Sequence, residues 1–244
     1  MNAAIPMLIS TENLRSNAAD TKLACTLAAV AGALNTAAFE VVGFFSANMT
    51  GNVSSLSDHL AKANLVPGLF FLEIVCIFIA GSAFSTLLIN AGRRKNMRAV
   101  YAFNIIIEGI GLVLLGAVEI WLNPLSHGVM LILSLSFLMG LQNAVVTRIS
   151  NARVRTTHIS GTSTDIGIEL AMLFDVVRRK ESPKDAPVYL ERLRLHFSTL
   201  MSFLTGGVAG IWLFHLLGYG FLICIGISVI MLALHNMVHK QQDL

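Results

Sequence analysis

The chain has 244 residues, of which 55% are hydrophobic and 13% are charged, with a mean hydropathy of +0.72 and a formal net charge of +3. Because soluble domains carry about 25% charged residues, this composition excludes an ordinary soluble protein and indicates an integral membrane protein in contact with the lipid bilayer. The basic residues lie in short clusters between apolar runs, which excludes nucleic-acid binding and instead reports the orientation of the chain in the membrane.

The first half contains three apolar segments that are long enough to cross about 30 Å of hydrocarbon as helices. They are residues 25–45, 67–89 and 99–120. Between the first two lies the polar turn Asn48-Met49-Thr50-Gly51-Asn52, within a segment too short and too polar to cross alone. This segment, residues 46–66, is predicted to be a re-entrant loop with a half-helix.

The second half repeats this order of elements. A span is predicted at residues 125–146, and the long apolar run 197–237 is divided into two spans by Gly218-Tyr219-Gly220. The connection between these segments holds a second polar turn, His158-Ile159-Ser160-Gly161-Thr162, and a short helix at residues 165–177. Residues 178–195 are charged and are predicted to form a cytoplasmic linker.

These elements predict an all-α, polytopic membrane bundle of six transmembrane helices. Its two three-helix repeats are residues 25–120 and 125–237, flanked by tails at residues 1–24 and 238–244. The basic cluster at residues 93–98 falls on the same side as Arg15 and Lys22 only if neither half-helix crosses completely. By the positive-inside rule both termini are then cytoplasmic, in the inner membrane of a bacterium.

The two polar turns occupy matching positions in the halves. Thr50-Gly51-Asn52 matches Ser160-Gly161-Thr162 at an offset of 110 residues, and Asn35 matches Asn143 at an offset of 108. Because each half has three spans, the halves enter the membrane in opposite senses, which defines an inverted repeat. Interrupted helices at matching positions of such a repeat indicate a transporter site near the midplane. The alternative is that the turns are tight loops left by a duplication.

Hydroxyl, amide and carboxylate groups at membrane depth normally line a cavity, because lipid cannot satisfy them. Half-helix N-termini would suit an anionic or carbonyl ligand. The predicted substrate-binding residues are Asn35, Thr50, Gly51, Asn52, Gln142, Asn143, Thr157, Ser160, Gly161, Thr162 and Asp165. For Asp165, a role as the N-cap of the second half-helix is an equally good interpretation.

Three glutamates, Glu40, Glu73 and Glu108, lie inside predicted spans. A charged side chain at the centre of a spanning helix costs about 2.5–3.5 kcal/mol on insertion scales, so each glutamate is a candidate for proton or cation coupling. Glu108 is the most central and the leading candidate. The alternative for all three is a structural ion pair or a protonated acid bonded to a neighbouring helix.

Other chemistry has little support in the sequence. Cys25, Cys76 and Cys224 lack metal-ligand spacing and are interpreted as buried apolar residues, and the pair His235 and His239 lacks the glutamate of a zincin motif. We therefore expect no metal, no cofactor, no catalytic residue and no enzymatic activity. Gly206 and Gly210 have GxxxG spacing, which favours close helix packing within one chain or in a homodimer.

The chain resembles the YoaK-type bacterial membrane proteins, a family that contains a domain of unknown function. The resemblance rests on Met49-Thr50-Gly51-Asn52, on Gly140-Leu141-Gln142-Asn143-Ala144, and on Arg155-Thr156-Thr157 followed by Gly161-Thr162 and Asp165. It covers residues 25–237 and implies about six spans, without a substrate. Two positions depart from it, since Asn35 stands where the family often has aspartate and Ser160 where threonine is commoner.

The expected function is therefore transport of a small polar or anionic solute by alternating access, with the solute held between the two turns. The alternative from another class is a membrane scaffold or sensor that recruits a partner through residues 175–194. A membrane enzyme is third, because no nucleophile with a positioned base is visible.

Overall fold

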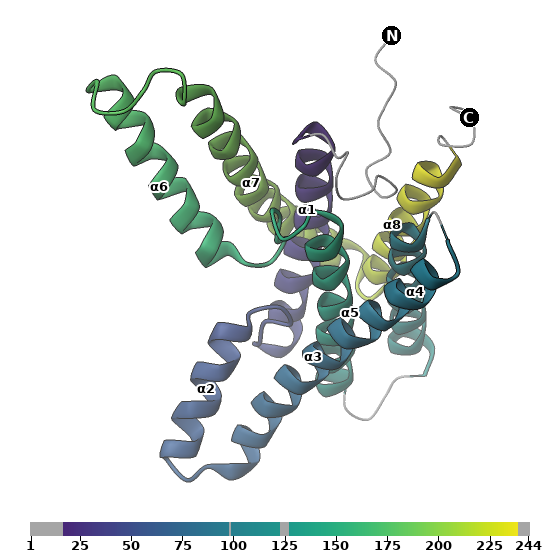
Figure 1. Cartoon of the computed structure of the whole chain (residues 1–244). Helices are drawn as coiled ribbons and strands as arrows, with labels where there is room; N and C mark the ends of the chain where they lie inside the picture. Colours follow the sequence, from purple (N-terminus) through teal and green to yellow (C-terminus); the bar gives the residue numbers. More distant parts are fainter. Residues whose placement is uncertain (1–16, 98, 123–126, 239–244) are drawn as a thin grey trace.

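The computed structural model describes residues 17–97, 99–122 and 127–238, and these form eight α-helices with no strand among them (Figure 1). The helices are α1 (Asn17–Val42), α2 (Met49–Ala61), α3 (Leu65–Arg94), α4 (Val100–Trp121), α5 (His127–Ile149), α6 (Ile159–Val177), α7 (Ala186–Leu217) and α8 (Gly220–Val238). The predicted all-α class is confirmed.

Six of these helices are long and apolar enough to cross a membrane, namely α1, α3, α4, α5, α7 and α8. The chain is therefore a multi-pass membrane protein, as predicted. The helix α2 has 13 residues, so at 1.5 Å per residue it is about 20 Å long, which is too short to cross the hydrocarbon core. The helix α6 has 19 residues but carries Asp165, Glu169 and Asp175 along its length.

Several helix boundaries differ from the predicted ones. Residues 17–24, predicted as tail, belong to α1. Most of the predicted linker at residues 178–195 is also helical, because α7 begins at Ala186, and only residues 178–185 connect α6 to α7. Pro187 is tolerated there because the first turn of a helix does not need its N–H group. The helix α6 begins at Ile159, so Asp165 lies beyond its first turn and is not the N-cap.

The turn at Gly218 is present, since Gly218 caps α7 with a φ of 55°. The tails at residues 1–16 and 239–244, the start of the span at residue 125, and His239 lie outside the described residues.

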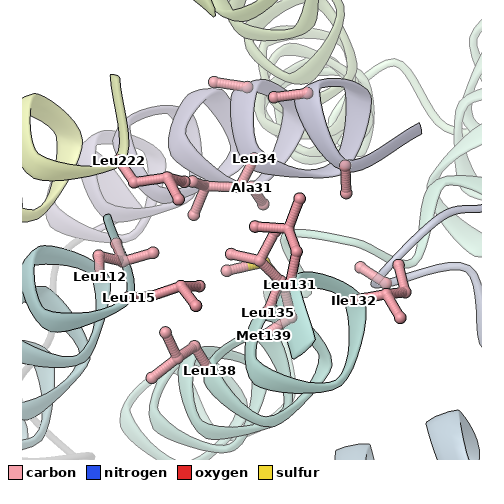
Figure 2. Close-up of a cluster of buried hydrophobic side chains, with 14 of the residues drawn as sticks. Ala31, Leu34, Leu112, Leu115, Leu131, Ile132, Leu135, Leu138, Met139 and Leu222 are labelled. Atoms are coloured by element: carbon pink, nitrogen blue, oxygen red, sulfur yellow. The ribbon is translucent and has the colours of Figure 1, made fainter. Parts of the chain in front are cut away.

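The bundle core lies where α1, α4, α5 and α8 meet. Figure 2 shows Leu34 from α1, Leu112 from α4, Leu135 from α5 and Leu222 from α8 in one buried cluster. The six spanning helices pack most closely in three pairs, α1 with α7, α3 with α5, and α4 with α8. Each of these pairs joins a helix of the first half to a helix of the second.

Glycines permit two of these pairs to approach closely. A Cβ added at Gly140 of α5 would collide with the backbone carbonyl of Phe78 on α3, and one at Gly32 of α1 with the carbonyl of Phe203 on α7. A side chain that meets backbone cannot relieve the contact by changing rotamer, so only glycine fits at these crossings.

The glycines with GxxxG spacing are used within the chain. Gly206 packs against Ala29, and Gly210 packs against Ala33, so both lie in the contact between α7 and α1. The expected close packing is therefore present inside the monomer, and these two glycines give no support to a homodimer.

The helices α2 and α6 form two hairpins with α3 and α7, the spans that follow them. In Figure 1 the α2–α3 hairpin extends toward the bottom and the α6–α7 hairpin toward the top, while the N-terminal ends of α2 and α6 lie between them. The two polar turns at these N-terminal ends are thus brought to the middle of the molecule.

Candidate functional site

In both polar turns the side chain before the helix lies against the glycine three residues later. The Oδ1 atom of Asn48 accepts a hydrogen bond from the backbone N–H of Gly51 at 3.1 Å, which caps α2. His158 takes the corresponding place before α6, without a side-chain cap bond. A Cβ at Gly51 would come within 2.6 Å of the Asn48 side chain, and one at Gly161 would collide with the His158 ring. Glycine at this position therefore lets the preceding side chain fold over the first turn.

Asparagines from α1 and α5 hold the segments that lead into these turns. Asn35 is buried, and its Oδ1 atom accepts a hydrogen bond from the N–H of Ala47 at 2.9 Å. The Oδ1 atom of Asn143 accepts one from the Thr157 hydroxyl, also at 2.9 Å. Asn35 and Asn143 thus have equivalent roles, since Asn35 anchors the loop before α2 and Asn143 anchors the loop before α6.

One cavity of about 770 Å³ is lined by both turns. Six of the predicted binding residues line it: Asn35, Thr50, Gly51, Asn143, Thr157 and Ser160. These residues come from both halves of the chain, from four helices and the loop before α6, so the fold brings together groups that lie more than 100 positions apart in the sequence.

The same cavity has lining residues that the sequence analysis missed. They are polar or basic (Asn48, Ser54, Thr147, Arg155, His158), aromatic (Phe45, Phe78, Phe203) or otherwise apolar (Ala47, Met49, Ile159). Arg155 is exposed, and no carboxylate among the described residues pairs with its guanidinium group. Its position directly before Thr156-Thr157 could have indicated this role, but a basic residue in a long charged connection is not informative by itself.

Asn52 and Thr162 are buried beneath the turns instead of lining this cavity. The Asn52 amide donates to the Phe45 carbonyl at 3.3 Å, and the Thr162 hydroxyl donates to the His158 carbonyl at 3.2 Å. Thr162 lines a second, smaller cavity of about 310 Å³ together with Gly161 and Asp165. These three predicted residues are therefore separate from the shared cavity.

Gln142 connects the candidate site to Glu108. Its amide donates to Glu108 Oε1 at 2.9 Å, and its Oε1 atom accepts from the Thr156 hydroxyl at 3.3 Å. All three side chains are fully buried, and the second carboxyl oxygen of Glu108 has no hydrogen-bond partner among the described residues. A buried polar chain thus runs from α4 through α5 to the residue beside Thr157 at the cavity wall.

The other two glutamates lie elsewhere. Glu40 has an exposed side chain whose Oε1 atom is 3.4 Å from Nε2 of His215 on α7. Glu73 is exposed on α3, and no hydrogen bond or ion pair from the described residues reaches it. The structure therefore does not bring Glu40, Glu73 and Glu108 together, and Glu108 is the buried member of the three.

Metal-ligating residues do not cluster in the part of the chain that the structure describes. Cys76 and Cys224 are exposed on the helix surfaces, and Cys25 is half-buried, so the interpretation of all three as buried residues is wrong. An apolar neighbourhood in the sequence does not imply burial in this protein, because the outer faces of spanning helices contact lipid.

One family of known sequences matches nearly the whole length of the chain. The profile of the family described as "Protein of unknown function (DUF1275)" matches residues 23–235. The chain belongs to this family. The match confirms the resemblance to an uncharacterised family of membrane proteins, and it includes both polar turns and all six spanning helices. No curated protein and no solved structure matches the chain, so DUF1275 membership adds no substrate.

Proposed function

We propose that the protein transports a small polar or anionic solute across the membrane by alternating access, and that it does not act as an enzyme. The observation that carries this proposal is the cavity of about 770 Å³ lined by Thr50 and Gly51 from one turn and by Ser160 from the other. A cavity between interrupted helices of two halves, with a few polar groups in a largely apolar wall, is the arrangement in which secondary transporters bind their solutes.

The arrangement as an inverted repeat, with residues 25–120 and 125–237 as its halves, is supported by paired contacts. Gly32 contacts the Phe203 carbonyl, and Gly140 contacts the Phe78 carbonyl in the same way. The two glycines are 108 positions apart in the sequence, and the two phenylalanines are 125 positions apart. The reverse contacts follow the same two offsets: they join Gly206 to Ala29 and Gly81 to Phe137. A two-fold relation between the halves accounts for both sets, and it allows one half to rock against the other.

The lining favours an anion or a solute with a carbonyl group. The N-terminal ends of α2 and α6 both face the cavity, and helix N-termini attract negative charge. Arg155 and His158 add basic groups, while Asn35, Asn143, Thr50 and Ser160 supply hydrogen bonds. Among the described residues that line the cavity there is no carboxylate to oppose an anion.

Glu108 is the proposed proton or cation coupling residue. It lies outside the cavity but is joined to the cavity wall through Gln142 and Thr156. A change at its carboxyl group can therefore alter the loop that leads into α6 without direct contact with the solute.

We further propose that both termini are cytoplasmic and that the membrane is the inner membrane of a bacterium. This orientation is supported by the basic residues Arg93 and Arg94 in the last turn of α3 and Lys95 directly after it, on the same side as Lys22 near the start of α1.

A thermal-shift screen on the purified protein tests the function. Phosphate, sulfate, lactate and glutamate would be compared with choline, and we expect at least one anion to raise the melting temperature. A ligand at 100 times its Kd stabilises the native state by about 2.7 kcal/mol, which corresponds to a shift of several degrees. Ser160→Trp should fill the cavity and abolish the shift.

Two variants serve as controls in this screen. Thr164→Trp changes α6 one turn further along, at an exposed position that lines neither of the two cavities described above, and should keep the shift. Glu108→Gln should also keep it, because Glu108 does not line the cavity. A shift that survives Ser160→Trp would contradict the proposed site, and no shift with any anion would favour the scaffold or sensor alternative.

A further inference from the structure

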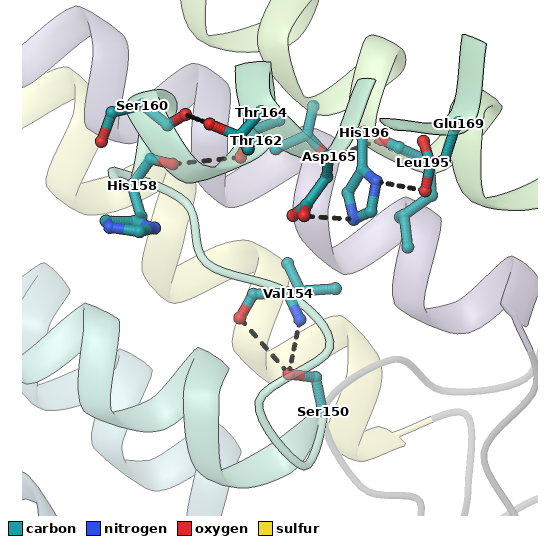
Figure 3. Close-up of polar contacts among 11 residues, drawn as sticks. Ser150, Val154, His158, Ser160, Thr162, Thr164, Asp165, Glu169, Leu195 and His196 are labelled. Atoms are coloured by element: carbon teal, nitrogen blue, oxygen red, sulfur yellow. Dashed lines mark hydrogen bonds and ion pairs between the residues drawn. The ribbon is translucent and has the colours of Figure 1, made fainter. Parts of the chain in front are cut away.

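Between α6 and α7 the structure contains a cluster of ionisable groups that the proposed solute site does not use. His196 on α7 lies between two carboxylates of α6, with its Nδ1 atom 2.9 Å from Glu169 Oε1 and its Nε2 atom 3.9 Å from Asp165 Oδ2 (Figure 3). Asp165 and Glu169 are four residues apart, so they lie on one face of α6. This face is turned toward α7.

The cluster lies at the junction of two cavities. One is the cavity of about 310 Å³ beside the N-terminus of α6, and the other, of about 610 Å³, extends toward Thr21 and Arg192. Arg153, Asp165, Leu195 and His196 line both of them. The His196 side chain and its carboxylate partners therefore lie between the two cavities.

The smaller cavity also adjoins the central one. Arg155 and His158 line both the cavity of about 310 Å³ and the solute cavity of about 770 Å³. The three cavities thus follow one another from the middle of the molecule, past the start of α6, to the first residues of α1 and α7. In the proposed orientation those residues are at the cytoplasmic face.

We propose that this series of cavities is the cytoplasmic half of the solute path, and that His196, held by Glu169, is the residue that narrows it. The inference rests on the proposed function and adds to it the route by which the solute cavity reaches the cytoplasm.

The polarity of the walls supports a hydrated path. Glu169 is 5% exposed, and its Oε2 atom has no hydrogen-bond partner among the described residues. A buried carboxylate oxygen is rarely left without a partner, so this atom indicates a position where water or a passing polar group donates a hydrogen bond. The neighbouring Arg153, Asp165 and Arg192 are equally unsuited to contact with lipid.

Thiol labelling tests the path without knowledge of the solute. In a chain with Cys25, Cys76 and Cys224 replaced by alanine, Thr199→Cys would place a thiol in the smaller cavity, where Thr199 is 3% exposed. Everted membrane vesicles would be treated with sulfonatoethyl methanethiosulfonate, which does not cross membranes. We expect labelling at least about ten times faster than at Ser136→Cys, because only a thiol in contact with water reacts.

Ser136 is a matched control. It is also buried, its hydroxyl also donates to the carbonyl four residues earlier, and it lines none of the three cavities. Labelling of Thr199→Cys no faster than that of Ser136→Cys would overturn the proposed path. Because this readout involves no solute, such a failure is distinct from failure of the thermal-shift screen at Ser160.

Variants of His196 test its role as the narrowing residue. In the Thr199→Cys chain, His196→Trp should slow labelling by filling the junction, and His196→Ala should accelerate it, so either variant is decisive if the other fails to fold. Phe197→Trp, at a neighbouring position with 53% exposure that lines none of the three cavities, should leave the rate unchanged. A rate unaffected by both substitutions at His196 would show that water reaches Thr199 by another route.

Discussion

Replacing Gly140 with leucine is expected to prevent the protein from folding stably. The crossing of α5 and α3 places the Gly140 Cα against the Phe78 carbonyl, and a Cβ there would collide with backbone. Overpacked sites cost about 1–3 kcal/mol even when side chains can move aside, and here the neighbouring atoms are backbone, so we expect a loss of about 3 kcal/mol or more. The yield of monodisperse protein in detergent and its melting temperature would measure the effect.

Gly167→Leu is the matched control for this substitution. Gly167 is exposed on α6, and a Cβ there would meet nothing within 4 Å. Because glycine is about 0.8–1.0 kcal/mol less favourable than alanine inside a helix, Gly167→Leu should be neutral or slightly stabilising. Equal stability of the two variants would mean that α3 and α5 do not cross at Gly140.

Replacing Asn35 with leucine is expected to release the first polar turn. The Asn35 side chain accepts hydrogen bonds from the Ala47 N–H at 2.9 Å and from the Ser46 hydroxyl at 3.4 Å, and all three residues are buried. A buried donor left without an acceptor costs about 1–3 kcal/mol, so the loop should move to reach water or the protein should lose that stability. We expect a melting temperature several degrees lower and loss of any anion-induced shift.

Asn35→Asp separates the hydrogen bond from the other properties of the side chain. Aspartate keeps the acceptor oxygen, so the Ala47 bond and the stability of the turn should be retained relative to Asn35→Leu. If Asn35→Asp were as unstable as Asn35→Leu, the anchoring role of the Oδ1 atom would be wrong.

The length and composition of the apolar segments were sufficient to predict the six spanning helices. A helix is one of the few structures in which all backbone hydrogen bonds of a 20-residue segment are made inside lipid. The helix ends were less predictable. The charged residues Glu191, Arg192 and Arg194 led to the prediction that the first part of α7 is a linker. Charged side chains at an exposed helix end, however, do not destabilise the helix. Contacts between helices, such as that of Gly140 with Phe78, could be identified only from the structure.

The candidate site could be predicted in part. The sequence similarity between the two turns placed Thr50 and Ser160 in matching positions, and both residues line one cavity. The same reasoning failed for Asn52 and Thr162, since a polar residue after a glycine can equally well bond to its own loop, as both of these do. Periodicity alone also could not distinguish the buried Glu108 from the exposed Glu73, because in a membrane protein apolar neighbours lie on both faces of a helix.

Cross-linking of the two turns tests the central claim most directly. Thr50→Cys and Ser160→Cys would be combined in the cysteine-free chain, with a protease site inserted at Asn96 in the turn between α3 and α4. After treatment with a short bis-methanethiosulfonate reagent and cleavage, we expect the two fragments to remain joined. The pair Thr50→Cys with Thr164→Cys, one turn further along α6, should separate. Separation of the fragments in the Thr50–Ser160 pair would contradict a cavity shared by the two turns.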